Sequence, residues 1–289
     1  MRIARFRRDG DSVRTGFVVD GTIFPAVGEG ASADLASLLG DGDDRLTTME
    51  ESARRGTGYS LDDVSLGPPI DNPRAVLCVG RNYAEHAAET KSEIPTEPII
   101  FAKLTSSIIG PHDDIVLPAV APRRIDYEAE LTVVIGRTGR DIAEEDAWGF
   151  VRGYLVANDV TARDWQLKKP GGQWLLGKSF DTFLPIGPFL VTADEVPDPT
   201  RLHVTCTVNG ELLQDDTPDH MIFSIPHLIA YVSAVTTLHP GDLILTGTPA
   251  GIGASRVPPI WLKPGDVVET SVETIGTIRN TVRAADALK

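Results

Sequence analysis

Short apolar runs, separated by turns rich in glycine and proline, make up most of the chain after residue 74. Their shortness and their β-branched residues are typical of strands rather than helices. We expect strands at 75–79, 99–102, 115–117, 131–135, 154–160, 189–191, 204–208, 243–246 and 267–274, and helices at 82–89, 144–151 and 224–236. The pattern predicts a mostly β protein of the α+β class, whose sheets roll up or pack on each other.

The first 70 residues follow a different pattern. Two apolar runs flank Asp20-Gly21, a strong hairpin signal, and a polar helical region comes after them. Prolines then gather between residues 68 and 73, where they cannot continue a helix or a central strand. We therefore expect a small N-terminal α/β domain at 1–70 and a larger, strand-rich domain at 71–289.

Composition narrows the classes of partner. The formal net charge of -14 argues against nucleic acid or an anionic membrane as a partner, because both select basic patches. Four arginines near the start, Arg2, Arg5, Arg7 and Arg8, precede no apolar segment, so we expect no signal peptide, no membrane span and a cytoplasmic location. The two cysteines, Cys78 and Cys206, form no CxxC pair, and we expect small buried hydrophobic residues there rather than a disulfide.

Two glutamates stand two residues apart in the β-branched stretch 125–136, which we expect to form one strand. The strand period of two places Glu128 and Glu130 on one face, and Asp126 points the same way. If that face is buried, the anions repel one another unless a cation neutralises them. Asp159, near the end of a strand expected at 153–161, adds a third carboxylate. Oxygen ligands suit Mg²⁺, Mn²⁺ or Ca²⁺ rather than zinc, whereas the alternative for each carboxylate is a solvent-facing strand residue.

The helix expected at 82–89 carries a candidate general base. Asn82 suits the N-cap position, with Glu85 closing a capping box. His86 and Glu89 are three residues apart on one helical face, so the carboxylate orients the imidazole and raises its basicity. The alternative is a surface ion pair. The general-base interpretation is favoured only if the dyad lies close to the carboxylates.

Two further segments offer groups that bind an oxyanion. Lys178 lies in a glycine-bounded segment that contains an aromatic residue, and residues 246–253 combine glycines with threonine hydroxyls. A solvated lysine and an ordinary glycine-rich connection are the alternatives. Gln166, Lys169 and Gln173 precede Lys178, either as contacts for the tail of a substrate or as surface polar residues.

Taken in order, five segments resemble the fumarylacetoacetate hydrolase family. They read Val-Gly-Arg-Asn-Tyr-Ala-Glu-His at 79–86, Asp-Tyr-Glu-Ala-Glu-Leu at 126–131, Asn-Asp-Val-Thr-Ala-Arg-Asp at 158–164, Gly-Lys-Ser-Phe-Asp-Thr at 177–182 and Thr-Gly-Thr-Pro-Ala-Gly-Ile-Gly at 246–253. The resemblance runs from about residue 74 to the end. It implies a β-sandwich roll, a homodimer and a catalytic domain at 71–289 that acts on small 2-oxo or 1,3-dicarbonyl carboxylates.

The same resemblance implies a role for each candidate residue. Glu128, Glu130 and Asp159 resemble the ligands for Mg²⁺, Mn²⁺ or Ca²⁺; His86 and Glu89 resemble a catalytic dyad carried on a lid; and Lys178 resembles the active-site lysine. Substrate contacts are implied for Arg81, Tyr83, Arg163, Gln166, Thr182 and Thr248. Val79 stands where the original hydrolase has an additional aspartate ligand, so a site of three carboxylates is the better model, without Asp126 as a ligand.

Three reactions fit such a site. We favour hydrolytic C–C cleavage of the acylpyruvate or fumarylacetoacetate type, in which His86 takes a proton from water and Lys178 stabilises an enolate. Decarboxylation of an acid such as oxaloacetate, and isomerisation of 2-oxo or 2-hydroxy-diene dicarboxylates, use the same enolate. A non-catalytic binding module on this fold is expected to lose the ligands, and a carbohydrate-binding sandwich would need rows of aromatic residues, which 6% aromatic content disfavours.

Overall fold

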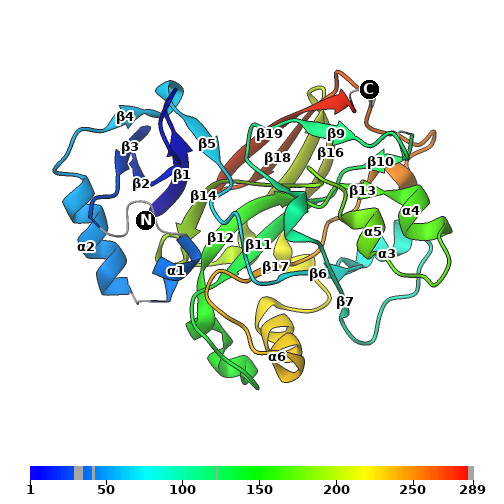
Figure 1. The fold of residues 1–289 in the computed structure, drawn as a ribbon. Coiled ribbons are helices and arrows are strands. Elements are labelled where there is room, and N and C mark those ends of the chain that lie inside the picture. The colour runs from blue at the N-terminus through cyan, green and yellow to red at the C-terminus, as the bar shows by residue number, and fades with distance from the viewer. Residues whose placement is uncertain (29–34, 41–42, 122, 286–289) are drawn as a thin grey trace.

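Strands dominate the computed structural model, which describes residues 1–28, 35–40, 43–121 and 123–285 (Figure 1). Within these ranges, twelve strands join one large sheet in the order β4-β3-β2-β1-β14-β12-β11-β17-β6-β7, with β5 beside β1 and β8 beside β14. Their bounds are β1 (Arg2–Arg7), β2 (Arg14–Val19), β3 (Thr22–Pro25), β4 (Tyr59–Ser60), β5 (Ser65–Gly67), β6 (Val76–Gly80), β7 (Ile99–Ala102), β8 (Ile108–Ile109), β11 (Ala129–Ile135), β12 (Val151–Asn158), β14 (Leu184–Thr192) and β17 (Leu243–Leu245).

A second sheet packs against the central strands of the first. It runs β16-β15-β18-β19-β9, with bounds β9 (Ile115–Leu117), β15 (Val204–Val208), β16 (Glu211–Asp216), β18 (Val267–Val272) and β19 (Gly276–Ala284). Leu131 and Val133 of β11 share one apolar core with Cys206 of β15 and Val268 of β18. Alternate residues of each strand point into this core, as strand geometry requires. The predicted mostly β fold with packed sheets is confirmed.

The helices are short and few in the described part of the chain. They are α1 (Leu35–Leu39), α2 (Asp43–Ala53), α3 (Ala84–Glu89), α4 (Arg163–Lys168), α5 (Leu175–Lys178) and α6 (Ile225–Val235). In Figure 1, α3, α4 and α5 gather on the right, next to the small sheet of β10 (Ile125–Asp126) and β13 (Thr161–Ala162). The helix expected at 144–151 is a 3-10 segment, Glu144–Phe150. Helices α4 and α5 have no counterpart among the predicted helices.

The stretch 125–136 is not the single strand that we expected. β10 ends at Asp126 and pairs with β13, whereas β11 begins at Ala129 and pairs with β12 and β17. Because β10 and β11 hydrogen-bond to different strands, the chain changes direction between them. Glu128 therefore lies in the connection, and strand alternation does not decide where its carboxylate points.

The predicted N-cap role of Asn82 is also wrong. The N-cap residue of α3 is Tyr83, and no side chain caps the helix. The Asn82 amide instead donates to the carbonyls of Phe223 and Thr246 at 3.0 and 2.8 Å, and its oxygen accepts the Phe223 N–H at 2.8 Å. Asn82 thus fastens the start of α3 to two distant loops rather than capping it.

The N-terminal elements continue the large sheet. Strand β1 pairs with β14, so the sheet runs from the blue elements in Figure 1 into the body of the molecule. The predicted hairpin is confirmed: Asp20-Gly21 joins β2 to β3, with φ of 47° and 76°. Leu35 and Leu46, from α1 and α2, share a second core with strands β6 and β11. The division into domains at residue 70 stays a prediction.

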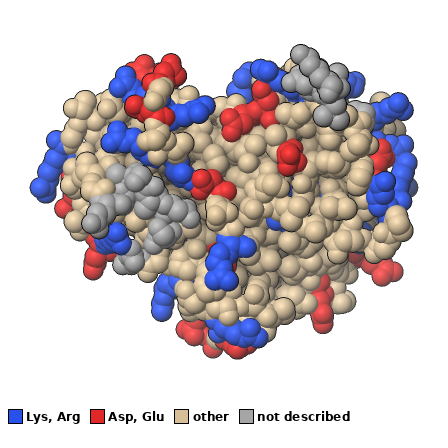
Figure 2. All heavy atoms as spheres, in the orientation of Figure 1, with Lys and Arg blue, Asp and Glu red and all other residues tan. Residues whose placement is uncertain are grey.

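The surface charges and the two cysteines agree with what the composition predicts. Cys78 and Cys206 are buried and unpaired. In the described part of the chain, no helix has the length and hydropathy needed to cross a membrane. On the face drawn in Figure 2, acidic and basic side chains of the described residues are interspersed, and they do not form one basic patch.

Candidate metal centre and active site

Three buried carboxylates meet at one end of the β11–β12 pair. Glu128 comes just before β11, Glu130 is the second residue of that strand, and Asp159 directly follows β12. Because Ala129 pairs with Asn158, the antiparallel register brings the three side chains to one place. One oxygen from each lies within 4.8 Å of the others, and the residues are 5%, 1% and 0% exposed, respectively. The structure therefore brings the three predicted ligands together.

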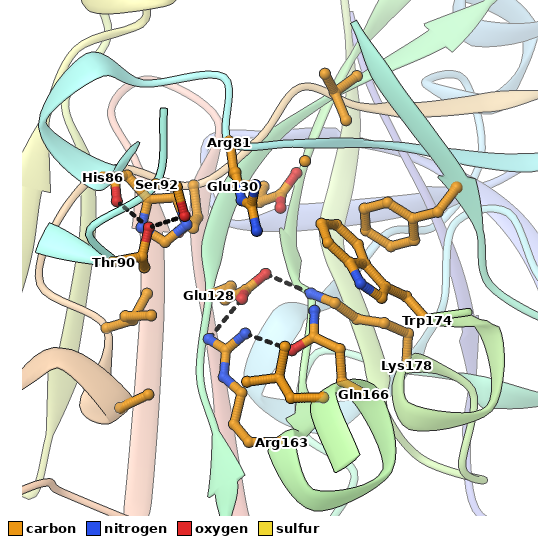
Figure 3. Close-up of a pocket in the computed structure, with 17 residues that line it drawn as sticks. Arg81, His86, Thr90, Ser92, Glu128, Glu130, Arg163, Gln166, Trp174 and Lys178 are labelled. Carbon is orange, nitrogen blue, oxygen red and sulfur yellow. Dashed lines mark hydrogen bonds and ion pairs between the residues drawn. The ribbon is translucent and has the colours of Figure 1, made fainter. Parts of the chain in front are cut away.

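Two cations hold Glu128 in its charged form (Figure 3). Lys178 Nζ donates to Glu128 Oε2 at 2.6 Å and to Asp159 Oδ2 at 2.7 Å. Arg163 Nη2 lies 2.7 Å from Glu128 Oε1 and 2.8 Å from Asp126 Oδ2. Burial by itself raises the pKa of Glu128, but Lys178 and Arg163 outweigh burial and lower that pKa to about 2.

Lys103 is a third cation at this centre, and it was not among the predicted residues. Its Nζ donates to Asp159 Oδ1 at 2.7 Å, to the Val160 carbonyl at 3.2 Å and to the Lys178 carbonyl. The side chain has no exposed surface. Burial lowers the pKa of Lys103, although Asp159 acts in the opposite direction. Lys103 directly follows β7 and is 56 positions before Asp159 in the chain. No local sequence pattern therefore indicates that the two side chains meet.

Glu130 is the carboxylate that lacks a cation. Its Oε2 accepts the Gly247 N–H at 2.7 Å, and no lysine or arginine among the described residues forms an ion pair with it. Burial, together with the charges of Asp159 and Glu128, raises the pKa of Glu130 well above its usual value. A divalent ion held by the three carboxylates would remove this repulsion, and an all-oxygen donor set suits Mg²⁺ or Mn²⁺. The residues present therefore fit a divalent metal ion.

The predicted dyad faces the same space as the carboxylates. His86 Nδ1 lies 2.7 Å from Glu89 Oε1, and Glu89 Oε2 accepts the Gly251 N–H at 2.9 Å. Glu89 is thus fixed from two sides. A carboxylate at Nδ1 keeps the proton on that nitrogen and leaves Nε2 as a proton acceptor. Because His86 is only 6% exposed and lines the cavity, the alternative of a surface ion pair does not apply.

A cavity of about 160 Å³ joins the dyad to the carboxylates (Figure 3). Its lining residues are Val79, Gly80, Arg81, His86, Thr90, Ser92, Phe101, Glu128, Glu130, Arg163, Gln166, Leu167, Trp174, Lys178, Thr248, Ile252 and Ala254. Trp174 forms one wall and packs edge-on against Phe101, with ring centroids 5.3 Å apart. A Cβ atom at Gly80 would come within 2.6 Å of the Trp174 ring, so this wall requires glycine at position 80.

The predicted substrate contacts divide into two groups. Arg81, Arg163, Gln166 and Thr248 line the cavity, together with the predicted metal ligands Glu128 and Glu130. Tyr83 and Thr182 do not line it: Tyr83 is fully buried, and the Thr182 hydroxyl accepts the Val116 N–H at 2.8 Å. Their predicted contact with substrate stays a prediction.

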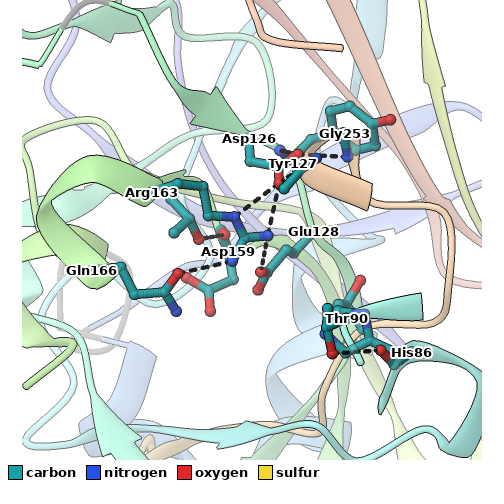
Figure 4. A network of polar contacts seen from close by, with 12 residues as sticks. His86, Thr90, Asp126, Tyr127, Glu128, Asp159, Arg163, Gln166 and Gly253 are labelled. Carbon is teal, nitrogen blue, oxygen red and sulfur yellow. Dashed lines mark hydrogen bonds and ion pairs between the residues drawn. The ribbon is translucent and has the colours of Figure 1, made fainter. Parts of the chain in front are cut away.

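Asp126 supports the site from behind. Its Oδ1 accepts the Gly253 N–H at 2.7 Å, and its Oδ2 accepts the Ala254 N–H at 3.0 Å and the Arg163 Nε–H at 2.8 Å. These donors satisfy both oxygens and fix Arg163, which in turn reaches Glu128 (Figure 4). Asp126 is thus arranged to position Arg163 rather than to bind a metal ion.

Sequence comparison places this chain in a known family. The family model described as fumarylacetoacetate (FAA) hydrolase C-terminal matches residues 75–283. The mitochondrial oxaloacetate tautomerase of Xenopus laevis is 51% identical over 243 residues, which cover 81% of this chain and 76% of that protein. A mitochondrial oxaloacetate tautomerase of Homo sapiens is 50% identical over 235 residues, covering 80% of this chain and 74% of that protein.

Solved structures agree with this assignment. The fumarylacetoacetate hydrolase of Exiguobacterium antarcticum superposes with a TM-score of 0.87 at 39% identity, over 98% of this chain and 99% of that one. The maleylpyruvate hydrolase of Sphingobium, in complex with manganese(II) and pyruvate, superposes with a TM-score of 0.82 at 32% identity, over the same shares. The matched fold, the long sequence match and the buried carboxylates lead to one conclusion: this chain belongs to the fumarylacetoacetate hydrolase family of metal-dependent enzymes.

Proposed function

We propose that the enzyme catalyses keto–enol tautomerisation of a small 2-oxo dicarboxylate of the oxaloacetate class. The observation that carries the proposal is that His86 and the carboxylates Glu128 and Glu130 line one cavity. Tautomerisation needs one proton acceptor and one group that stabilises an enolate, and these two sides of the cavity supply them. The two mitochondrial relatives that are 50–51% identical are named as oxaloacetate tautomerases, which supports the same reaction here.

Each residue has a task in this reaction. When bound by Glu128, Glu130 and Asp159, Mg²⁺ or Mn²⁺ supplies Lewis-acid polarisation of the 2-oxo group. His86 Nε2 removes a proton from C3, the C–H electron pair forms the C2–C3 double bond, and the 2-oxo oxygen takes the negative charge. Glu89 stabilises the imidazolium that results, because it accepts the Nδ1–H. The Lys178 ammonium donates a hydrogen bond to the enolate oxygen. The proton held on His86 Nε2 then passes to that oxygen, which completes the enol and restores the neutral imidazole.

Hydrolysis of a C–C bond in an acylpyruvate is the second candidate. It is favoured by the structural likeness to maleylpyruvate hydrolase, at 32% identity. In this reaction His86 would take its proton from water rather than from carbon, and the water would attack the carbonyl far from the carboxylates. The same enolate leaves, so the chelating half of the site serves both reactions.

One substrate panel separates these reactions. Enol and keto oxaloacetate should interconvert, measured by the ultraviolet absorbance of the enol, whereas hydrolysis would release pyruvate from acylpyruvates and decarboxylation would release CO₂. EDTA should abolish turnover, and Mg²⁺ or Mn²⁺ should restore it. Activity that survives complete metal removal would refute the proposal.

A histidine outside the cavity provides the control for the dyad. We expect His86→Ala to lose tautomerisation by about 10²–10⁴-fold. His203 forms a similar pair with Asp215 at 2.9 Å, but its side chain is 61% exposed. His203→Ala should therefore keep full activity, and a His86→Ala variant that equals it would show that the dyad is misassigned.

We also propose that the protein is a homodimer, as the family resemblance implies, and that it is located in the cytoplasm. Light scattering coupled to size exclusion measures the first property, and cell fractionation measures the second. A monomeric mass or a membrane-bound fraction would refute these two proposals without affecting the reaction.

A further inference from the structure

Arg81 brings a positive charge to the cavity without an acidic partner. The other cationic side chains that line the cavity are paired: Arg163 and Lys178 with Glu128, and His86 with Glu89. In the described part of the chain, no aspartate or glutamate forms an ion pair with Arg81. A guanidinium that faces a ligand cavity without a counter-ion is a binding site for an anionic group of the ligand.

The protein holds this guanidinium in place by other means. It lies over the Trp174 ring, 5.7 Å from the centroid. A cation–π contact uses none of the N–H groups as hydrogen-bond donors, and the fork of these donors matches the two oxygens of a carboxylate. In Figure 3, Arg81 enters the cavity from the side opposite Arg163, with Glu128 between them. An anion on Arg81 would therefore be held apart from the groups that neutralise Glu128.

The backbone at Arg81 supports a functional role. Its φ of 56° is in the left-handed region, which is unfavourable for a residue with a long side chain. The neighbouring residue Asn82 is fixed by three hydrogen bonds to Phe223 and Thr246, and this anchoring maintains the conformation. The chain thus keeps an unfavourable backbone where it directs a cation into the cavity.

We propose that Arg81 binds the distal carboxylate of a 2-oxo dicarboxylate whose 2-oxo acid end lies at Glu128, Glu130 and Asp159. This inference rests on the proposed function and names its selectivity: the enzyme prefers dicarboxylates to monocarboxylates with the same reactive end. A monocarboxylate leaves the Arg81 guanidinium without an anionic partner.

Binding of two unreactive acids tests the inference without turnover. L-Malate and L-lactate share the 2-hydroxy acid end and differ in the distal carboxylate, and neither can form an enol. Calorimetry on the Mg²⁺-loaded enzyme should show malate bound roughly tenfold to a hundredfold more tightly than lactate, as expected for a charge-assisted hydrogen-bonded pair. Arg81→Gln should remove most of this preference, and Arg81→Lys should keep part of it.

Arg137 supplies the matched control. It also lies over an aromatic ring, 5.0 Å from the Phe150 centroid, but it is exposed and does not line the cavity. Arg137→Gln should keep the full preference for malate. Mn²⁺ affinity of each variant, measured without an organic acid, checks that the site is folded, and if Arg81→Gln fails this check, Arg81→Lys carries the comparison.

Two results would overturn the inference: equal binding of malate and lactate by the unmodified enzyme, or a malate preference that survives in Arg81→Gln. The proposed function fails separately. An Arg81-dependent preference for malate in an enzyme that does not tautomerise oxaloacetate would refute the reaction and leave the carboxylate subsite intact.

Discussion

Replacing Lys103 with methionine removes a buried charge of known geometry. The ammonium bonds Asp159 Oδ1 at 2.7 Å and two backbone carbonyls, of Val160 and Lys178. Methionine fills most of the same volume, so the change is mainly the loss of charge and of these hydrogen bonds. Removing one partner of a buried ion pair costs about 3–5 kcal/mol. We take the lower end, about 3 kcal/mol, because Lys178 still neutralises Asp159 Oδ2 at 2.7 Å.

Urea denaturation in the presence of EDTA, followed by tryptophan fluorescence, measures this loss as a change in the free energy of unfolding. Lys263, which is exposed, provides the control, and Lys263→Met should change stability by less than about 0.5 kcal/mol. Saturating Mg²⁺ should narrow the difference between Lys103→Met and the unmodified enzyme, because the metal ion restores positive charge beside Asp159. A metal-free Lys103→Met protein as stable as the Lys263→Met control would refute the role of Lys103 as a counter-ion.

Three further predictions concern other buried groups. Glu130→Gln should abolish Mn²⁺ binding in calorimetry yet stabilise the metal-free protein at neutral pH, because the raised pKa of Glu130 means that its charge opposes folding. This gain should disappear as the pH falls below the ordinary glutamate pKa of about 4.3, and a gain that persists there would contradict the reasoning. Glu89→Gln should lower kcat for tautomerisation by about 10²-fold with little change in KM, whereas Asp215→Asn, at the exposed His203, should change neither. Burial raises the pKa of the Cys78 and Cys206 thiols, so iodoacetamide should label them only after unfolding, and mass spectrometry of labelled native protein would reveal the opposite.

The sequence is most informative where it breaks an ordinary pattern. Carboxylates beside an apolar strand are an electrostatic anomaly, so the sequence alone marks Glu128, Glu130 and Asp159 as ligand candidates. His86 and Glu89 are found for a different reason, since residues three apart on a helix are neighbours whatever the fold.

Contacts made across the fold leave no such mark. Lys103 reaches Asp159 over 56 positions, and the Asn82 amide reaches a carbonyl 164 positions away, which is why its capping signal is misleading. The strands follow from local alternation, but their order in the sheet, such as β17 lying parallel to β6, depends on pairing between distant segments. The short helices α4 and α5 pack against each other, and so close an approach requires Gly177, where a Cβ would meet the Gln166 backbone at 2.5 Å.

The carboxylates proposed to bind the metal ion and the other groups that line the cavity are carried by different kinds of structure. Glu130 lies on β11, which is hydrogen-bonded to β12 on one side and to β17 on the other. The position of Glu130 therefore depends on the pairing of the central strands of the sheet. His86 lies on the short helix α3, Arg81 in the turn before α3, and Trp174 directly before the short helix α5. Substitutions in such turns damage folding less than substitutions in a central strand. A few substitutions in these turns can therefore change the reaction while the three carboxylates stay in place. The relatives are named as a tautomerase, a hydrolase and an isomerase, which agrees with such a division of the fold.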